Sequence, residues 1–376
     1  MERDSLWVGV DSHSAEADGE GNATYTRNLL TALYALPGDA AFALLAGNPA
    51  HAFYGTLPAR GRSRAIAVRQ GGGALRLAAT LTRAARRARV DCLHVQYAAP
   101  LGWRRPLVVT VHDLGFLHVP ESFPAGLRLA LAVLVPRSIR GASRVVTCSE
   151  FCRRDIEGRY RAAAGKVTVI PLGAAARFHP RSALETRAVL GRHGLEPGFL
   201  FALGRLNRRK NLERLLRAYG RLRADGVTGA PLVIGGKPDY GVEDVLHRAK
   251  LAADGASVRF AGLIPDADLP AFYAGAACFV YPSLFEGFGL PVIEAMACGT
   301  PVVSSNRAAL PELIGDAGLL VDAESVDQIA SAVARVLGDA DLARDIGRRG
   351  LERSRRYSWA ETARRTLEVY GAVASR

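Results

Sequence analysis

Short apolar runs, many of them rich in β-branched residues, alternate with longer helical stretches along almost the whole chain. In the first half the strand candidates are Leu6–Val10, Cys92–Val95, Leu107–Val111, Arg144–Cys148 and Val167–Ile170. A strand that is apolar throughout is buried on both faces, and helical crossovers are the connections that parallel strands require. The alternation therefore predicts an α/β protein with parallel sheets.

The pattern breaks after Pro171 and restarts at Phe199. Because 376 residues are long for one domain, we predict two α/β domains, residues 1–175 and 176–356. In open parallel sheets, ligands bind beyond the carboxyl ends of the strands. The loops that follow the predicted strands are therefore the candidates for a functional site. The second set of strands and helices is predicted at Phe199–Leu203, Leu212–Leu222, Pro231–Ile234, Val258–Ala261, Cys278–Tyr281, Pro291–Ala297, Pro301–Ser304, Val326–Leu337 and Trp359–Val373.

The loop after Cys278–Tyr281 is the richest of these candidates. It holds Glu286, the run Gly287-Phe288-Gly289-Leu290, Pro291 and, eight residues after the first glutamate, Glu294. Proline near the first position of a helix marks its start, so the amides before it can face an anion such as a diphosphate. A carboxylate can accept from two neighbouring hydroxyls of a sugar or ribose. Alone, either glutamate could equally be a helix cap; the combined string is more specific.

This segment resembles the signature of the large group of retaining GT-B glycosyltransferases known as family 4, or glycosyl transferases group 1. The resemblance implies two Rossmann-like domains that face each other across a cleft. The first would bind the acceptor and the second the nucleotide sugar, and the last helix, residues 357–376, would cross back to the first domain. Further matching segments are Val109–Leu117, Val145–Asp155, Val169–Gly173, Leu203–Leu212, Gly262–Asp266 and Pro311–Asp322.

The resemblance also implies roles for individual side chains of the second domain. In that family the glutamate matching Glu286 contacts the hydroxyls of the donor sugar, and the one matching Glu294 holds the ribose. The basic pair matching Arg205 and Lys210 binds the diphosphate. Cleavage of a sugar–phosphate bond leaves negative charge on the diphosphate, which fixed cations stabilise. A solvated basic loop is the alternative for that pair. The donor site is completed by Gly287, Phe288, Gly289 and Leu290.

In the first domain, Gly21 lies in a loop, Asp18–Tyr25, that resembles the family's glycine-rich loop near the donor phosphate. Many members carry Gly-Ile-Gly there, and this chain has Gly-Asn-Ala-Thr-Tyr instead. His112 follows a predicted strand and matches the histidine that reaches the donor sugar, so we predict it as catalytic together with Glu286. The alternative is a strand-end histidine held by Asp113. On the acceptor side we predict Gln96, Tyr97 and Asp113.

Neither a metal nor a cofactor is expected besides the nucleotide-sugar substrate. Two Asp-x-Asp strings, Asp266–Asp268 and Asp339–Asp341, look like metal motifs but lie at predicted helix starts, where aspartate caps amides. The family needs no metal. The five cysteines are odd in number and scattered through apolar segments, which predicts reduced core residues of a cytoplasmic protein.

The net charge of +13 is placed unevenly. Residues 1–180 hold 23 Lys and Arg against 13 Asp and Glu, a difference of +10. A basic face suits an anionic membrane, an acidic substrate or a nucleic acid, although only four of the 49 basic residues are lysine, which a GC-rich genome would also produce. No signal peptide or bilayer span is predicted, because the longest apolar stretch, Leu127–Val135, contains Arg128 and is too short. We expect a cytoplasmic protein with possible peripheral contact at the inner face of the membrane.

The resemblance implies retaining transfer of a hexose by front-face attack, because no enzymic nucleophile is evident. The His112–Leu117 region most resembles members that use GDP-mannose to build bacterial surface polysaccharides on a glycan or polyprenyl-diphosphate-linked acceptor. A UDP-sugar-dependent glucose or N-acetylglucosamine transferase acting on a small molecule is the alternative. A non-catalytic nucleotide- or nucleic-acid-binding protein is more remote, because no nucleic-acid-binding signature is present. A nicotinamide dehydrogenase would need a Gly-x-Gly-x-x-Gly turn, which the first loop lacks.

Overall fold

The computed structural model describes residues 5–19, 21–69, 76–240, 242–243 and 257–375. The chain divides into two compact units. The first comprises Met1–Leu114, Ala125–Leu172 and Trp359–Arg376, and the second Gly115–Pro124 and Gly173–Ser358. The change near residue 172 is close to the predicted boundary at 175. The segment Gly115–Pro124 lies within the predicted first domain but clusters with the second unit.

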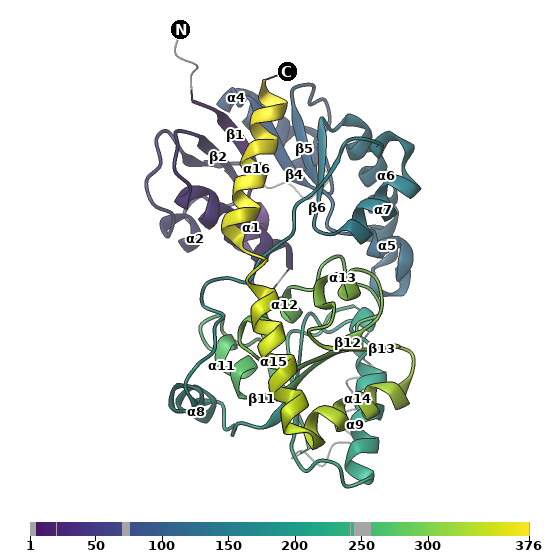
Figure 1. Cartoon of the computed structure of the whole chain (residues 1–376). Coiled ribbons are helices and arrows are strands. Elements are labelled where there is room, and N and C mark those ends of the chain that lie inside the picture. The colour runs from purple at the N-terminus through teal and green to yellow at the C-terminus, as the bar shows by residue number, and fades with distance from the viewer. Residues whose placement is uncertain (1–4, 20, 70–75, 241, 244–256, 376) are drawn as a thin grey trace. The chain divides into compact units, whose positions relative to one another are not determined.

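In the first unit the described residues form a seven-stranded parallel sheet in the order β3-β2-β1-β4-β5-β6-β7 (Figure 1). Strands β1, β2 and β5 are buried along their whole length and β4 up to its last residue, as a sheet covered on both faces requires. The strands are β1 Trp7–Asp11, β2 Ala41–Ala46, β3 Arg64–Ala67, β4 Cys92–Gln96, β5 Leu107–Thr110, β6 Arg144–Thr147 and β7 Val167–Val169.

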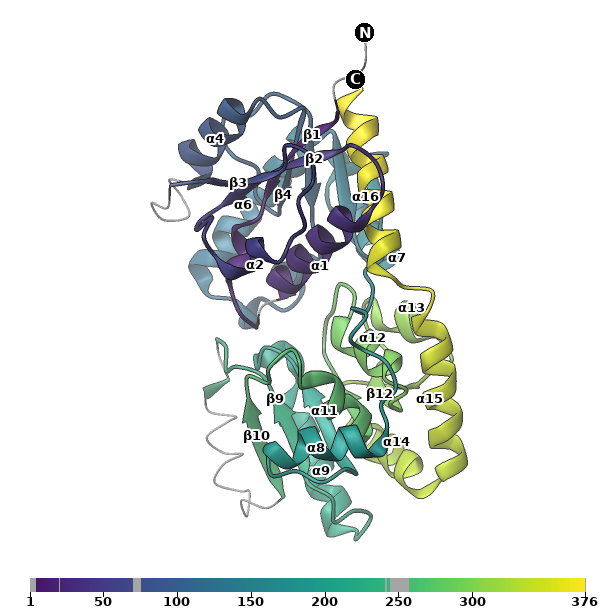
Figure 2. The same ribbon diagram turned by 90° about the vertical axis from the view of Figure 1, so that its left-hand side faces the viewer.

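The last helix of the chain, α16 (Trp359–Ala374), packs beside α1 (Gly21–Ala35) in this unit (Figure 2). Hydrogen bonds hold it there: the Thr362 hydroxyl donates to the Pro171 carbonyl and Arg365 to the Val169 carbonyl, both at 2.7 Å, and the Tyr370 hydroxyl lies 2.6 Å from Nδ1 of buried His94. The remaining helices are α2 Ala52–Gly55, α4 Leu81–Ala88, α6 Ala125–Gly141 and α7 Glu150–Arg159, with short turns η1 His13–Glu16, η2 Arg76–Thr80 and η4 Arg161–Ala163.

The second unit has a six-stranded parallel sheet among its described residues, in the order β10-β9-β8-β11-β12-β13. The strands are β8 Phe199–Leu203, β9 Leu232–Gly235, β10 Val258–Gly262, β11 Ala276–Tyr281, β12 Val302–Ser305 and β13 Leu319–Val321. The helices are α5 Gly115–His118, α8 Ala183–Arg192, α9 Leu212–Ala224, α11 Leu269–Gly275, α12 Leu290–Ala297, α13 Leu310–Ile314, α14 Val326–Gly338 and α15 Ala340–Ser354, with turns η3 Pro120–Ser122 and η5 Arg208–Lys210.

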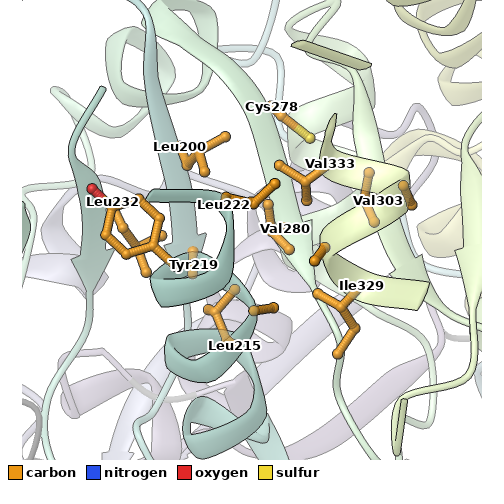
Figure 3. Packing of buried hydrophobic residues seen from close by; sticks show 14 of the residues in the cluster. Leu200, Leu215, Tyr219, Leu222, Leu232, Cys278, Val280, Val303, Ile329 and Val333 are labelled. Atoms are coloured by element: carbon orange, nitrogen blue, oxygen red, sulfur yellow. The ribbon is translucent and has the colours of Figure 1, made fainter. Parts of the chain in front are cut away.

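One face of this second sheet is covered by α9 and α14, whose apolar sides meet the strands (Figure 3). Leu215, Tyr219 and Leu222 are spaced three and four residues apart, which places them on one side of α9. The Tyr219 hydroxyl donates to the Ala230 carbonyl at 2.9 Å, so the only polar atom of that side chain is satisfied. This packing fixes the sheet whose loops carry the predicted donor site.

The topology also locates where a ligand can bind in each unit. After β1 the chain adds β2 on one side, and β4 later pairs on the other side, so β1 and β4 flank a switch point. In the second unit β8 and β11 flank the corresponding point. Ligands of doubly wound sheets bind at such points, outside the carboxyl ends of the strands.

Several local predictions from the sequence are corrected. Strands β2 and β3 went unpredicted because Ala41–Ala46 and Arg64–Ala67 are rich in alanine, which has a low strand propensity. Asn211 has a residue type that commonly caps helices and it directly precedes α9, yet its side chain makes no cap; its amide donates instead to the carbonyls of Pro282 and Ala323, at 3.0 and 2.6 Å. It therefore ties the α9 start to two distant loops.

Candidate active site

The loop after β11 turns sharply at Gly289 and enters α12. Gly289 has φ +107°, and a Cβ there would lie 2.9 Å from Cδ2 of Leu310, so both backbone conformation and space demand glycine. Leu290 and Pro291 open the helix, and no acidic residue lies in its first turn. The amide groups at this helix start therefore form the positive end of the helix dipole, and no carboxylate within the first turn of the helix offsets it.

Glu286 lies at the start of this loop and is buried, with three side-chain contacts on one oxygen. Its Oε1 lies 2.6 Å from Nζ of Lys210, 2.9 Å from the Tyr281 hydroxyl and 2.6 Å from the Ser283 hydroxyl. Burial alone would raise its pKa, but the positive charges of Lys210 and Arg209 and the hydrogen bonds outweigh it and lower the pKa to about 2. Glu286 is therefore a fixed negative charge at any physiological pH.

The Lys210 side chain has room to reach Glu286 because its neighbour Gly204 has no side chain. A Cβ on Gly204 would lie 2.9 Å from Cε of Lys210, and Gly204 has φ +153°. The ammonium also lies over the Tyr281 ring, 4.7 Å from its centroid, and donates to the Tyr281 hydroxyl. Lys210 lies in the turn η5 that follows β8, and Tyr281 is the last residue of β11. These are the two strands that flank the switch point.

Glu294 lies one turn inside α12 and is buried in a different environment. Its Oε2 accepts a 2.9 Å hydrogen bond from the hydroxyl of buried Tyr273. Burial raises the pKa of Glu294 to about 7, and the Tyr273 bond and the charge of Arg177 offset only part of that rise. The two glutamates therefore differ in charge state near neutral pH: one is ionised and the other is half protonated.

Arg205 follows β8 and is the most exposed of the predicted charged residues, with 45% of its side chain accessible. It forms an ion pair with Asp239 at 3.1 Å. Among the predicted donor-site residues, the second unit thus holds Arg205, Lys210, Glu286, Gly287, Phe288, Gly289, Leu290 and Glu294.

In the first unit the structure brings together His112, Gln96 and Tyr97. Nε2 of His112 lies 2.8 Å from Oε1 of Gln96, whose amide donates to the hydroxyls of Ser14 and Thr26 at 3.1 and 2.8 Å. These two donations orient the glutamine so that its oxygen faces the histidine, which therefore carries its proton on Nε2. Burial lowers the pKa of His112 to about 4, so the ring is neutral at physiological pH.

Tyr97 follows β4 in a left-handed backbone conformation, φ +57°, which is uncommon for a residue with a side chain. Its amide donates to the Thr110 carbonyl at 2.8 Å, and its ring meets that of His112 edge-on at 5.6 Å. Asp113 raises the pKa of His112, although less than burial lowers it. Gly21, predicted in a loop, is instead the first residue of α1 and is exposed; Glu20 before it lies outside the described residues.

Both halves of the chain match models of glycosyltransferase families. Residues 190–353 match the model described as "Glycosyl transferases group 1", and residues 20–176 match "Glycosyltransferase Family 4". O-antigen chain mannosyltransferase B of Escherichia coli is 33% identical over 264 residues, which cover 70% of this chain and 69% of that protein. The chain belongs to glycosyltransferase family 4.

Two further similarities bear on this glycosyltransferase. Serotype-specific mannosyltransferase WbdA of Escherichia coli is 34% identical over 192 residues, which cover 50% of this chain but only 23% of that protein. Sucrose-phosphate synthase of Thermosynechococcus elongatus has a TM-score of 0.77 at 23% identity, over 99% of this chain and 100% of that one. The second similarity concerns the fold alone. With the two parallel sheets it confirms the predicted α/β class and GT-B fold.

The two Asp-x-Asp strings of the glycosyltransferase differ in whether an aspartate caps the helix that follows. Asp339 caps α15 by accepting from the Leu342 amide at 2.9 Å, as predicted. Asp268 precedes α11 but makes no side-chain cap; it pairs with Arg192 and His193 at 2.7 and 2.9 Å instead. Across the described ranges, His, Cys, Asp and Glu side chains nowhere gather in threes at a spacing that could hold a metal ion. All five cysteines are buried and free.

The sequence singled out charged and glycine positions of the glycosyltransferase, but it did not single out the residues that contact them in the structure. Tyr273, Tyr281, Ser283 and Asp239 each contact a predicted site residue. For Tyr281 and Ser283 a signal existed, because Tyr281 is the last residue of β11 and Ser283 lies in the loop that follows it. Tyr273 and Asp239 are distant in sequence from the residues they contact, and no local pattern marks them.

Proposed function

We propose that this glycosyltransferase moves a hexose, with retention of anomeric configuration, from a nucleotide-diphosphate sugar to a glycan or polyprenyl-diphosphate-linked acceptor. Mannose is the favoured sugar, because the O-antigen and serotype-specific relatives are named mannosyltransferases. GDP-mannose is the favoured donor, because the His112–Leu117 region resembles family members that use it. The observation that carries the proposal is the donor-site geometry of the second unit. In that unit two buried glutamates lie before and after the α12 start: Glu286, whose pKa is lowered, and Glu294, whose pKa is raised. Lys210 contacts Glu286.

In this proposal Glu286 binds the hydroxyls of the donor sugar. Its three contacts with Lys210, Tyr281 and Ser283 all involve Oε1, so the sugar hydroxyls approach Oε2. A carboxylate that stays ionised accepts charge-assisted hydrogen bonds, which are stronger than neutral ones. The fixed contacts on Oε1 keep the carboxylate in one orientation while the sugar reacts.

The diphosphate binds between Arg205, Lys210 and the amides at the start of α12. The bond between the anomeric carbon and the diphosphate oxygen breaks, and its electron pair stays on that oxygen. The acceptor hydroxyl forms the new bond on the same face and gives its proton to the leaving oxygen. Arg205, Lys210 and the α12 start stabilise the negative charge that develops on the leaving diphosphate oxygen. Electrostatic stabilisation of this kind is usually the largest contribution that an enzyme makes to such a step.

His112 acts on the donor sugar as a neutral ring. Because Nε2 donates to Gln96, the lone pair lies on Nδ1 and can accept from a sugar hydroxyl. With a pKa of about 4, the ring is neither an imidazolium that neutralises charge nor a proton donor at neutral pH. Gln96, Tyr97 and Asp113 surround it on the proposed acceptor side.

A UDP-linked glucose or N-acetylglucosamine donor is the alternative, because none of the described contacts reads the base. Neither donor needs a metal in this scheme, since the two cations and the helix start provide the positive charge. A lipid-linked acceptor would place the protein at the inner face of the cytoplasmic membrane, and the basic first 180 residues suit that surface. No helix among the described residues is both long and apolar enough to span a bilayer.

The test is nucleotide release from a panel of GDP-, UDP-, ADP- and dTDP-sugars by wild type, Glu294→Ala and Arg205→Ala. Slow hydrolysis of one donor by wild type, lost in both variants, is the expected result and identifies the sugar. Release from no donor, together with no thermal stabilisation by any nucleotide, would exclude the proposed activity. Release that survives in both variants would place the donor site elsewhere.

A further inference from the structure

The ring of Tyr25, a residue of α1, lies directly against the ring of His112. Their centroids are 4.5 Å apart and their planes meet at 78°, which is an edge-to-face arrangement. Tyr97 meets the same imidazole at 5.6 Å and 61°. Aromatic rings attract each other in this geometry, because the positive edge of one ring faces the negative face of the other. His112 therefore contacts two tyrosine rings in addition to Gln96, which accepts from its Nε2.

Both tyrosines are anchored on Thr110, the last residue of β5. The Tyr25 hydroxyl lies 3.1 Å from Oγ1 of Thr110, and the Tyr97 amide donates to the Thr110 carbonyl at 2.8 Å. Tyr25 and Thr110 are both buried. One residue of the sheet thus sets the position of two rings that come from different elements.

The hydrogen bonds continue from Thr110 into the core of the first unit. Nε2 of His94 lies 2.7 Å from Oγ1 of Thr110, and Nδ1 of His94 lies 2.6 Å from the hydroxyl of Tyr370 on α16. Each of these four buried side chains has a polar partner, as burial in a core requires. Burial lowers the pKa of His94 to about 3 and raises the pKa of Tyr25, so the network is uncharged at physiological pH. A buried network in which every member is satisfied holds its side chains in one arrangement.

The two tyrosine rings fix the plane of the His112 imidazole. A single hydrogen bond at Nε2 constrains the tilt of that plane only weakly, and Nδ1 moves with the plane. Edge-to-face contacts with Tyr25 and Tyr97 block the tilt. Since a catalytic group must be held within a fraction of an ångström to act, the direction of Nδ1 decides whether it can accept from a sugar hydroxyl.

We propose that Tyr25 is a positioning residue of the glycosyl transfer: its ring, anchored on Thr110, holds the His112 imidazole in the orientation that the sugar hydroxyl requires. The last helix takes part through two side chains. Tyr370 ends the hydrogen-bond network, and the ring of Trp359 meets that of Tyr25 at 6.1 Å. This inference rests on the proposed role of His112 and adds the residue that fixes its ring.

The kinetic test compares Tyr25→Leu and Tyr25→Phe with Tyr34→Leu, each at a temperature below its own unfolding transition. Tyr34 is the matched control, because it is another buried tyrosine of α1 and its ring stacks on Phe42 at 5.6 Å. Tyr25→Leu should lower kcat for donor hydrolysis about 10- to 100-fold and leave the donor KM nearly unchanged. Tyr25→Phe keeps the ring and loses only the hydroxyl, so its kcat should stay within about fivefold of wild type. Tyr34→Leu should keep the wild-type kcat.

A second measurement reports on the imidazole without any donor. Nitrogen NMR of protein labelled with ¹⁵N-histidine distinguishes protonated from unprotonated ring nitrogens, and His112→Gln identifies the signals of that ring. Wild type and Tyr34→Leu should show one tautomer, protonated at Nε2, and Tyr25→Leu a mixture of both tautomers.

An unchanged tautomer in Tyr25→Leu would overturn the inference whatever its rate, and so would an equal loss of kcat in Tyr25→Leu and Tyr34→Leu. If wild type hydrolyses no donor, the proposed function fails, and the nitrogen signals still decide whether Tyr25 holds the ring of His112.

Discussion

Replacing Glu294 with glutamine gives a direct test of the electrostatics of the donor site. The pKa of this carboxyl is raised from an ordinary 4.5 to about 7, chiefly by burial. The folded protein therefore binds the proton more tightly than the unfolded chain does. That contribution to stability is complete below pH 4.5 and is lost as the pH rises through 7. Glutamine has the same shape, cannot ionise and is free of this loss.

The two proton equilibria give the size of the effect. Between pH 5 and pH 8 the wild type should lose about 2.5 kcal/mol of unfolding free energy at this site, and Glu294→Gln should lose none of it. The measurement is urea unfolding of both proteins at the two pH values, so that every other titrating group cancels in the comparison. If the difference between the two proteins is the same at pH 5 and pH 8, Glu294 titrates near its ordinary value and the burial argument is wrong.

The same group should make binding of the nucleotide sugar depend on pH. The family resemblance implies that Glu294 binds the ribose, and only the ionised carboxylate could accept from both ribose hydroxyls. On that proposal wild-type affinity should fall as the pH drops below about 7, by up to tenfold for each pH unit. Tyr273→Phe removes the hydrogen bond that lowers this pKa, so the midpoint should move to higher pH. Calorimetric titration from pH 5.5 to 8.5 measures it, and a midpoint that stays in place would show that Tyr273 does not act on Glu294.

Three other perturbations test separate features of the second unit. Arg205→Ala should cut nucleotide release roughly 10²–10³-fold while costing under about 1 kcal/mol in urea unfolding, because its ion pair is exposed; comparable losses in both would contradict a donor-site role. Ser283→Ala removes one of the contacts on Glu286 and should cost about 1 kcal/mol, with slower donor hydrolysis; an unchanged rate would argue against positioning of the carboxylate. Gly236→Ala should lower the free energy of unfolding by about 3 kcal/mol or more, because φ is +122° and the new Cβ would lie 1.9 Å from the Gly204 carbonyl oxygen. Thermal unfolding measures the loss. Gly229→Ala is the control, because a Cβ there has no neighbour within 4 Å.

Local patterns in the sequence were enough to define much of the fold. Buried strands read as continuous apolar runs, so the positions of β1, β4, β5, β8 and β11 follow from composition alone, within a residue or two. The alanine-rich strands β2 and β3 gave no such signal, because only their place in the sheet makes them strands. Gly289 and Glu294 could be placed at a helix start, since turn and helix signals act over a few residues.

What the sequence alone determined is therefore the α/β class, the two-part organisation and the segment that contains Glu286 and Glu294. Only the tertiary structure decided that Lys210, Tyr281 and Ser283 all contact one oxygen of Glu286, and that burial raises the pKa of Glu294 to about 7. It also decided that Asn211 and Asp268 bind partners far along the chain instead of capping helices. The physical reason is range: hydrophobic periodicity and turn formation depend on neighbours in sequence, whereas proton affinity and hydrogen-bond choice depend on burial and on charges that only folding brings close.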